Sequence, residues 1–269
     1  MKKLFFLLCV IGTTVMMTSC LERENRYDDA GFVYIATSTE VTPEVNFGRV
    51  FSRAAGARLI TNRHIQDGSI TQSGIPVPLR PGNFYFFAFR WEEANGTTPI
   101  SEHLHADNAN IDSDVITIPG GDLSFVPVAE GTPLPEHAFL GVNPIIFFND
   151  ANWWNDHWIF EYGYLGGENP PIIQFHKREV APEDIHSSFT EINIDVRISD
   201  GFQPGTSPRG RAHATALNVA ELRNAFVDKT RELRVTFHYY SRVFRGDELT
   251  DEVRAEKNMH PIHFILREN

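Results

Sequence analysis

Residues that alternate between apolar and polar dominate the second half of this chain. In the segment 191–198, four aliphatic side chains share one face, and charged or amide side chains share the other. The same alternation returns at 233–239 and at 262–266. A period of two residues is that of a β-strand with one face buried and the other in water. This half is therefore predicted to form an antiparallel β-sandwich.

One segment of this half has a helical pattern instead. Val219, Leu222 and Phe226 would fall on one stripe of a helix. Asn218 is placed to cap that helix, and Glu221 follows three residues later, as in a capping box. A single helix over about 219–227 is predicted within the sandwich.

The first half also shows strand patterns. Residues 31–37 carry Val33 and Ile35 on one face, whereas the run 84–91 is apolar on both faces and predicts a central strand. Two short runs, 115–118 and 123–126, flank a Pro-Gly-Gly-Asp sequence, which predicts a hairpin. Because residues 132–143 are rich in proline and glycine, we place a domain boundary there and expect domains at 31–143 and 144–269. The fold class expected is mostly β.

The first 20 residues have the composition of an export signal. Lys2 and Lys3 precede an apolar run from Leu4 to Ile11, and Thr18-Ser19-Cys20 ends the segment. This run is too short to span a bilayer. The sequence before Cys20 resembles the lipobox of bacterial lipoproteins, which implies that residues 1–19 are removed and that Cys20 is acylated. Several acyl chains would anchor the protein to a membrane.

After Cys20, residues 20–30 form an acidic segment that we expect to be a flexible tether. The other cysteine, Cys9, lies inside the signal, so the mature chain has no disulfide. The full chain has a net charge of −11, and loss of two lysines with the signal leaves 22 basic and 35 acidic side chains, or −13. A field of this sign opposes nucleic acid as a partner.

Histidines and oxygen ligands gather in one stretch of the first half. His103 and His105 would share a strand face, and with Asp107 they could bind zinc; the alternative is a polar loop. Residues 107–114 are rich in oxygen ligands for calcium, but they lack the glycine and the glutamate of an EF-hand loop. His260 and His263 would lie on opposite faces of a strand, and His238 is expected to be solvated. The sequence therefore predicts no metal site and no cofactor.

The stretch 149–158 holds three of the four tryptophans, Trp153, Trp154 and Trp158, together with Asp156. Aromatic faces beside a carboxylate suit the recognition of a sugar. The alternative is a structural role, because tryptophan buries a large area and often seals the contact between two domains. These four residues are the candidate ligand contacts of the chain, with burial of at least two of the rings as the competing expectation.

Catalytic motifs are not found in the sequence. It has no Gly-x-Ser-x-Gly elbow, no phosphate-binding glycine loop and no mature cysteine besides Cys20. Arg209, Arg211 and His213 form a small basic cluster after a Pro-Gly turn, which is typical of a flexible loop. We therefore expect a protein that is not an enzyme.

Taken together, these segments resemble the NigD-like family of Bacteroidetes outer-membrane lipoproteins. The resemblance implies an N-terminal OB-like small barrel, followed by a C-terminal β-sandwich. It rests on short motifs: Thr18-Ser19-Cys20, Val33-Tyr34-Ile35-Ala36, Arg80-Pro81-Gly82-Asn83-Phe84-Tyr85, Tyr162-Gly163-Tyr164-Leu165, Arg234-Val235-Thr236-Phe237 and His260-Pro261-Ile262-His263-Phe264.

The function expected is that of a non-catalytic binding or interaction module, anchored through Cys20 to the outer membrane on its periplasmic or exposed face. Its partner is expected to be an envelope protein or a glycan. Three alternatives remain open at this point: a glycan-binding module, a structural or assembly component of a surface appendage, and a scavenger of metal or haem. Small barrels offer a sheet face and loops to ligands, which favours binding.

Overall fold

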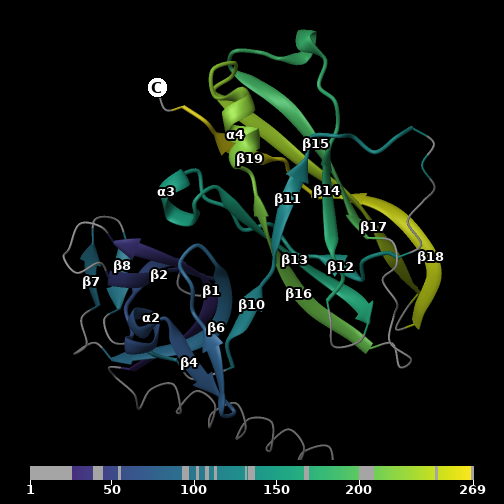
Figure 1. Cartoon of the computed structure of the whole chain (residues 1–269). Coiled ribbons are helices and arrows are strands. Elements are labelled where there is room, and N and C mark those ends of the chain that lie inside the picture. Colours follow the sequence, from purple (N-terminus) through teal and green to yellow (C-terminus); the bar gives the residue numbers. More distant parts are fainter. Residues whose placement is uncertain are drawn as a thin grey trace, which may run out of the picture. The chain divides into compact units, whose positions relative to one another are not determined.

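The computed structural model describes residues 26–38, 45–53, 56–92, 97–100, 103–106, 109–111, 114–130, 132, 137–166, 170–199, 209–245 and 248–267 (Figure 1). Cys20 and the predicted signal at residues 1–19 lie outside these ranges. Among the described residues, no helix has the length and apolar character needed to cross a membrane. The mostly β fold class is confirmed.

The chain forms two compact units, and the boundary falls between Thr117 and Ile118 rather than near residue 143. The reason is the strand β11 (Gly120–Ser124), which pairs with strands of the second unit only. The predicted hairpin between 115–118 and 123–126 is therefore wrong, because β10 (Ile116–Ile118) pairs instead with β6 (Phe84–Glu92) of the first unit.

The first unit is built on an eight-stranded sheet in the order β10-β6-β1-β2-β3-β8-β7, with β9 also paired to β6. Its remaining elements are β1 (Arg26–Ser38), β2 (Val45–Ser52), β3 (Gly56–Ile60), α2 (Arg63–Asp67), β4 (Ser69–Gln72), β5 (Ile75–Pro78), β7 (Thr97–Ile100), β8 (His103–Ala106) and β9 (Asn110–Ile111). β1 takes in residues 26–30, so the strand begins inside the segment expected to be a tether. The OB-like barrel stays a prediction.

Alternation explains the core of the first unit. Val33 and Ile35 of β1 are fully buried, as predicted, and Tyr85, Phe87 and Phe89 alternate along β6 beside them. β6 lies inside the sheet, between β1 and β10, as its apolar sequence predicted. The tyrosine hydroxyl of Tyr85 donates to the carbonyl of Pro78 at 3.0 Å, so its polar end is satisfied within this core.

The second unit is built on nine strands in the order β12-β13-β16-β11-β14-β15-β17-β18, with β19 also paired to β17. Its elements after β11 are β12 (Gly141–Val142), α3 (Ala151–Trp154), β13 (His157–Gly166), β14 (Ile173–Lys177), the 3-10 turn η2 (Pro182–Asp184), β15 (Phe189–Ile198), β16 (Arg209–Asn218), α4 (Ala220–Phe226), β17 (Glu232–Arg245), β18 (Glu248–Lys257) and β19 (Ile262–Ile265).

Strand β11 joins the two sheets of this sandwich. Gly120–Asp122 pair in parallel with β16, and Leu123–Ser124 pair in parallel with β14 (Figure 1). Gly121 sits where the strand passes between sheets, and a Cβ there would come within 2.8 Å of the Thr215 side chain and 3.1 Å of the Phe175 ring. A glycine is therefore needed for this close approach.

The opposite edges of the two sheets are joined through the segment 139–149. Phe139 donates its N–H to the Tyr240 carbonyl at 2.9 Å, while Leu140 donates to the Gly163 carbonyl of β13 at 2.8 Å. The sheet pairing is mixed rather than antiparallel throughout, because β15 and β17 run parallel. This difference from the prediction arises because β16 and α4 lie between β15 and β17 in the sequence, which gives the chain a crossover.

The core of the second unit follows the predicted faces. The alternating residues of β15, and Leu233, Val235 and Phe237 of β17, are buried, as are those of β19. Helix α4 covers this core with Leu222 and Phe226, as predicted. The amide oxygen of Asn218 accepts from the Ala220 N–H at 3.0 Å, so it satisfies the start of the helix, although Val219 occupies the N-cap position.

Candidate functional site

A cavity of about 470 Å³ opens between the two sheet edges of the second unit. We call it the edge pocket. One side is the segment 142–147, and the other is formed by β17 with the turn between β18 and β19. The lining residues are Val142, Asn143, Pro144, Ile145, Phe147, Phe237, Tyr239, Lys257, Asn258, Met259, His260, Pro261, Ile262 and His263.

Hydrogen bonds hold the two sides of the edge pocket together at its ends. At one end, Arg242 donates its N–H to the Phe139 carbonyl at 2.7 Å. At the other end, the side-chain oxygen of Asn149 accepts from the N–H of Ile265 at 2.9 Å. Between these two fixed points lie the pocket-lining residues of the segment 142–147 and of β17. The pocket is thus a slot in the sandwich, with both ends fixed.

Asn258 shapes the outer side of the slot. Its side-chain oxygen accepts from the Phe237 N–H at 2.7 Å, and its own N–H donates to the Phe237 carbonyl at 3.2 Å. Its amide nitrogen donates to the His260 carbonyl. These bonds satisfy β17 at the place where β18 has left it and β19 has not yet begun. The turn 258–261 therefore projects over the pocket without leaving the strand beneath it unsatisfied.

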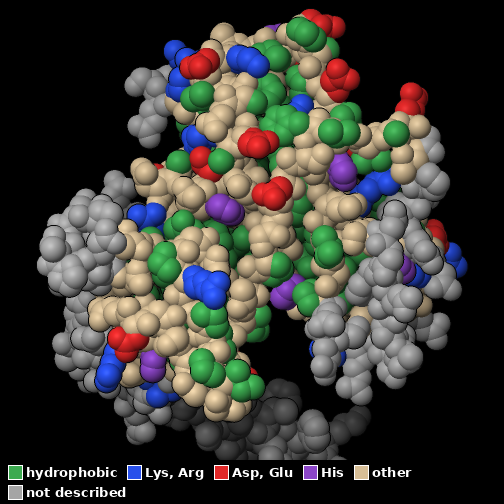
Figure 2. All heavy atoms as spheres, in the orientation of Figure 1, with side chains coloured by type: hydrophobic (Ala, Val, Ile, Leu, Met, Phe, Trp, Pro, Cys, Tyr) green, Lys and Arg blue, Asp and Glu red, His purple; other side chains and the backbone are tan. Residues whose placement is uncertain are grey.

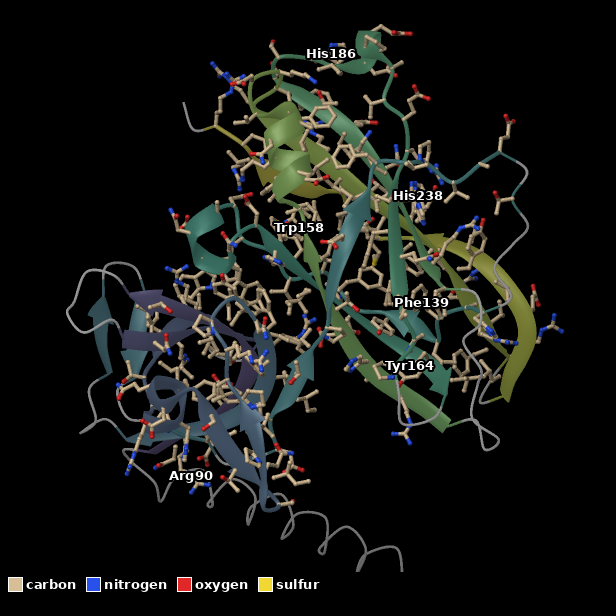
Figure 3. All side chains as sticks on the ribbon, viewed as in Figure 1. Arg90, Phe139, Trp158, Tyr164, His186 and His238 are labelled. Atoms are coloured by element: carbon tan, nitrogen blue, oxygen red, sulfur yellow. The ribbon has the colours of Figure 1, made fainter. Side chains whose placement is uncertain are left out.

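The floor of the edge pocket is aromatic. Phe237 is fully buried, and its ring lies 6.1 Å from Trp158, whose ring is also 5.9 Å from Phe147. Figure 3 shows Trp158 and Phe139 between the sheets of the second unit. Burial raises the pKa of Tyr239, and the nearby carboxylate of Glu256 adds to this effect, so its hydroxyl stays neutral at physiological pH. These rings form a rigid, apolar base.

The rim of the pocket is polar and carries no acidic residue among its lining side chains. Lys257, His260 and His263 are among the lining residues, and Met259 is 91% exposed at the tip of the turn. His263 Nδ1 lies 2.8 Å from Oε1 of Glu232, which also accepts from Arg234 at 2.9 Å. Burial opposes ionisation of Glu232, but the hydrogen bonds from these two partners outweigh it and lower the pKa of the carboxyl.

All three predicted tryptophans are buried. Trp153, Trp154 and Trp158 expose 4%, 1% and 0% of their surface, which confirms the expected burial. Phe148 packs on Trp153 and Trp154, with ring centroids 5.6 and 4.9 Å apart. A sugar needs an exposed aromatic face on which to stack, so the tryptophans do not form the glycan platform that the sequence allowed. Their role as ligand contacts is corrected to one in the core.

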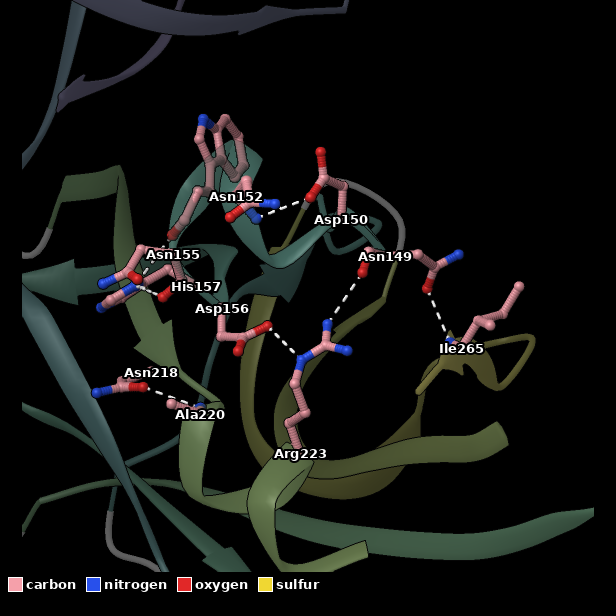
Figure 4. Close-up of polar contacts among 11 residues, drawn as sticks. Asn149, Asp150, Asn152, Asn155, Asp156, His157, Asn218, Ala220, Arg223 and Ile265 are labelled. Atoms are coloured by element: carbon pink, nitrogen blue, oxygen red, sulfur yellow. Dashed lines mark hydrogen bonds and ion pairs between the residues drawn. The ribbon is translucent and has the colours of Figure 1, made fainter. Parts of the chain in front are cut away.

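Asp156 is also a structural residue. Its carboxylate accepts from Arg223 Nε at 2.8 Å (Figure 4). Its backbone carbonyl accepts from the Val219 N–H at 2.8 Å. The Arg223 guanidinium also donates to the Asn149 carbonyl at 2.9 Å and lies 4.5 Å from the centre of the Phe264 ring. Asp156 therefore connects α4 to the loop before β13 and to β19, rather than facing a ligand.

The histidines do not converge. Among the residues that the structure describes, no group of three or more His, Cys, Asp or Glu side chains is arranged to hold a metal. His103 and His105 lie in β8, and Asp107 falls outside the described residues. His238 is half-buried rather than solvated: its Nε2 is 2.7 Å from the side-chain oxygen of Asn193. Burial lowers its pKa, as do the charges of Arg178 and Lys257, against the effect of Asp195.

The basic cluster expected at 209–213 is partly inside the fold. His213 and Tyr162 face each other across β16 and β13, with ring centroids 6.2 Å apart. Burial lowers the pKa of His213, and no described residue forms a hydrogen bond with its Nε2. Burial also raises the pKa of Tyr162 to about 12, although a hydrogen bond with Thr215 acts against it. Arg211 donates to the Gly166 carbonyl at 3.3 Å.

A second, polar pocket of about 430 Å³ lies beside β15. It is lined by Glu179, Val180, Asp184, His186, Phe189, Glu191 and Asn193. His186 lies on the loop between β14 and β15 (Figure 3). Arg234 stacks on the Phe189 ring at 3.6 Å beside this pocket. Its acidic side chains are exposed, and they make it a solvated surface hollow.

Lysine and arginine side chains are dispersed among acidic ones on the face shown in Figure 2. Several of the described arginines are paired with carboxylates, such as Arg178 with Asp195 at 2.8 Å and Arg245 with Glu252 at 2.9 Å. A nucleic-acid site needs a continuous basic surface. The described surface in this view does not provide one.

Comparison with known proteins gives a likeness in structure only. No family model matches the sequence, and no curated protein matches it either. A solved structure from Parabacteroides merdae, described as an uncharacterised protein, has a TM-score of 0.56 with 10% identity over 89% of this chain and 99% of that one. One from Bacteroides fragilis, described as a candidate lipoprotein, has a TM-score of 0.52 with 10% identity over 88% and 98%.

The chain has the fold of these two proteins. A NigD-like immunity protein from Bacteroides caccae is also similar, with a TM-score of 0.48 and 10% identity over 89% of this chain and 97% of that one.

The sequence did not indicate the edge pocket. Its inner side, residues 142–147, lies at the predicted domain boundary, which rests on the proline and glycine of residues 132–143. The signal that could have found it is the pair Ile145 and Phe147, two apolar side chains at alternate positions in a segment without a strand pattern. Met259 on the other side is a large apolar residue in a polar turn, which is a second such signal.

Proposed function

We propose that this protein is a cell-envelope lipoprotein, anchored through Cys20, whose second unit is a non-catalytic binding module for an apolar ligand. The observation that carries the binding role is the edge pocket, with Phe237 and Tyr239 at its base. A pocket of this size lies within the ~300–1,000 Å³ typical of small-molecule sites. Its aromatic lining and its few polar rim groups suit an apolar guest more than a sugar.

The anchoring role is supported by the order of charged, apolar and small residues before Cys20. The likeness of the fold to a candidate lipoprotein agrees with it. Cys20→Ala in the full chain should abolish incorporation of radiolabelled palmitate and move the protein from the membrane fraction to the soluble fraction. A variant that stays with membranes after a high-salt wash would contradict the proposal.

The binding role is testable with the neutral dye N-phenyl-1-naphthylamine, which fluoresces in apolar surroundings. We expect the mature protein to bind it and Ile145→Trp, which fills the edge pocket, to lose most of the signal. Ile172→Trp is the matched control, because Ile172 is 73% exposed and outside the pocket.

A second variant tests whether a loss of dye binding comes from a change in the pocket rather than from unfolding of the protein. Met259 is 91% exposed, so Met259→Asp should leave the unfolding midpoint unchanged while it places a charge on the rim. Weaker dye binding by Ile145→Trp and Met259→Asp, with wild-type binding by Ile172→Trp, supports the edge pocket as the site. Equal binding by all four proteins would refute it.

A further inference from the structure

A row of paired side chains crosses the outer face of one sheet of the second unit, from β14 through β15 and β17 to β18. His176 pairs with Asp195, which pairs with His238, labelled in Figure 3. His238 pairs in turn with Lys257. Directly paired residues point to the same side of a sheet, and successive residues point to opposite sides. The row therefore lies on the side opposite to Phe237, the neighbour of His238 that forms part of the floor of the edge pocket.

This row carries more positive than negative charge. Arg178 donates to both carboxylate oxygens of Asp195, at 3.1 and 2.8 Å, so the acid of the row is already paired. Lys257 is exposed and faces a histidine, and Arg197 adds a further cation two residues after Asp195 on the same face. Burial lowers the pKa of His238, and the charges of Arg178 and Lys257 lower it further, so both cations lie near this ring. This part of the face is therefore positive, although the chain has a net charge of −11.

Neutral hydrogen-bonding groups and an aromatic ring accompany these charges. The side-chain oxygen of Asn193 lies 2.7 Å from Nε2 of His238, and Gln174 is exposed on β14. Tyr240 is half-buried and pairs with Ala255, whose methyl group is too small to cover a phenol ring. Amide groups bond to hydroxyls, and the flat side of an aromatic ring packs against the apolar side of a sugar. The surface thus offers both kinds of contact that a sugar uses.

The row adjoins the polar pocket beside β15, because Asn193 belongs to both. The acidic side chains that line this pocket are Glu179, Asp184 and Glu191. An ionised carboxylate only accepts hydrogen bonds, so these groups suit hydroxyl donors and repel a second anion. The face therefore offers cations at the row and acceptors in the pocket. A ligand that matches both has an anionic group at one end and hydroxyl groups at the other.

An acidic peptide matches only one of these two features. It brings carboxylates for Lys257, but its repeated charge meets the acids of the polar pocket. An acidic sugar at the end of an oligosaccharide brings one carboxylate and many hydroxyls. We propose that this face binds an oligosaccharide with a terminal acidic sugar, with the carboxylate beside Lys257 and His238 and the next sugar at Asn193 and the polar pocket. The inference goes beyond the proposed function, because the row and the floor of the edge pocket lie on opposite sides of the sheet.

Two matched pairs of sugars test this inference by NMR titration of the mature protein. Cellobiouronate differs from cellobiose in one carboxylate, and 3′-sialyllactose differs from lactose in one terminal acidic sugar. At least one acidic sugar is expected to bind about fivefold more tightly than its neutral partner, the factor that one exposed ion pair supplies. The bound carboxylate should also raise the pKa of His238, since a nearby anion favours the charged ring, whereas the neutral partner should leave that pKa unchanged.

Lys257→Gln should remove the preference for the acidic sugar, with an unfolding midpoint close to that of the wild type because the side chain is exposed. Arg254→Gln is the matched control and should keep the preference. Arg254 lies on the same strand, but it pairs with Ser241 on the other side of the sheet. Tetraglutamate should bind more weakly than the acidic sugar.

If tetraglutamate binds as tightly as the acidic sugar, the face recognises acidic peptides and the inference fails. It also fails if acidic and neutral sugars bind alike, if none of them binds, or if both variants lose the preference to the same extent. An unchanged pKa of His238 in the wild type with the acidic sugar bound would place the carboxylate elsewhere and overturn the inference. The dye assay of the edge pocket uses none of these ligands, so the two proposals are tested separately.

Discussion

The ion pair between Asp156 and Arg223 offers a quantitative test of the structural role given to Asp156. The two side chains expose 12% and 16% of their surface, so water screens the pair only in part. Asp156 has a φ of 55°, a left-handed conformation that asparagine also adopts readily. Asp156→Asn therefore changes the charge without adding backbone strain, whereas alanine would change both.

The expected loss follows from the contacts that each change removes. Asp156→Asn turns a charged hydrogen bond into a neutral one and should lower the free energy of unfolding by about 1–2 kcal/mol. Arg223→Met loses the bond to the Asn149 carbonyl as well, and it leaves a mostly buried carboxylate unpaired, which should cost about 2–4 kcal/mol. The double variant should be more stable than the sum of the two losses predicts, with a coupling energy of about 1 kcal/mol.

Urea unfolding followed by tryptophan fluorescence is the appropriate assay, because three of the four tryptophans lie in the second unit. Glu252→Gln is the matched control: Glu252 also accepts from an arginine, Arg245, but the two side chains are 54% and 73% exposed. That change should cost less than about 0.5 kcal/mol. If Asp156→Asn is as stable as Glu252→Gln, Asp156 is not an anchor of the fold, and its role as a ligand contact must be reconsidered.

Three further changes test the core, the turn and the pH response. Trp158→Ala should lower the free energy of unfolding by about 3–5 kcal/mol, measured by circular dichroism, because the ring is fully buried; a loss below about 1 kcal/mol would contradict its place in the core. Asn258→Ala should cost about 1–3 kcal/mol by leaving the Phe237 N–H unsatisfied, and Asn258→Asp should cost less because it keeps the acceptor. Burial lowers the pKa of His213, so the unfolded chain binds its proton first, and stability should fall as the pH drops below the ordinary histidine value of about 6.5. His213→Gln should flatten this fall in the urea midpoint between about pH 7 and 5, and an unchanged slope would show that other groups cause it.

The faces of the strands could be predicted from the sequence because alternation is a local property. In β15 and β17, the residues expected inside are inside, and the stripe on α4 is buried. Burial of the tryptophans was also predictable, since the area of an indole ring strongly favours the interior. The same residues could not reveal which buried groups adjoin a cavity, because this depends on distant segments that pack around them.

Pairing partners were not predictable from local patterns. The glycines at 120 and 121 are as compatible with a hairpin as with the passage of β11 between two sheets, and only the contacts to β14 and β16 decide between them. The parallel pairing of β15 with β17 depends in the same way on the crossover through β16 and α4. The edge pocket could not be predicted for the same reason, since its two sides come from segments that are distant in the sequence, residues 142–147 and 257–263.

The shared strand β11 also bears on how the second unit folds. Gly120 pairs with Ala216, and Leu123 pairs with Phe175. The pairing partners of β11 therefore lie roughly 50 to 100 residues later in the chain. Contacts of such high sequence separation slow folding, because loop closure must precede the gain from pairing. The two sheets therefore cannot be joined on this side until β16 is available, which follows every strand of the unit except β17, β18 and β19.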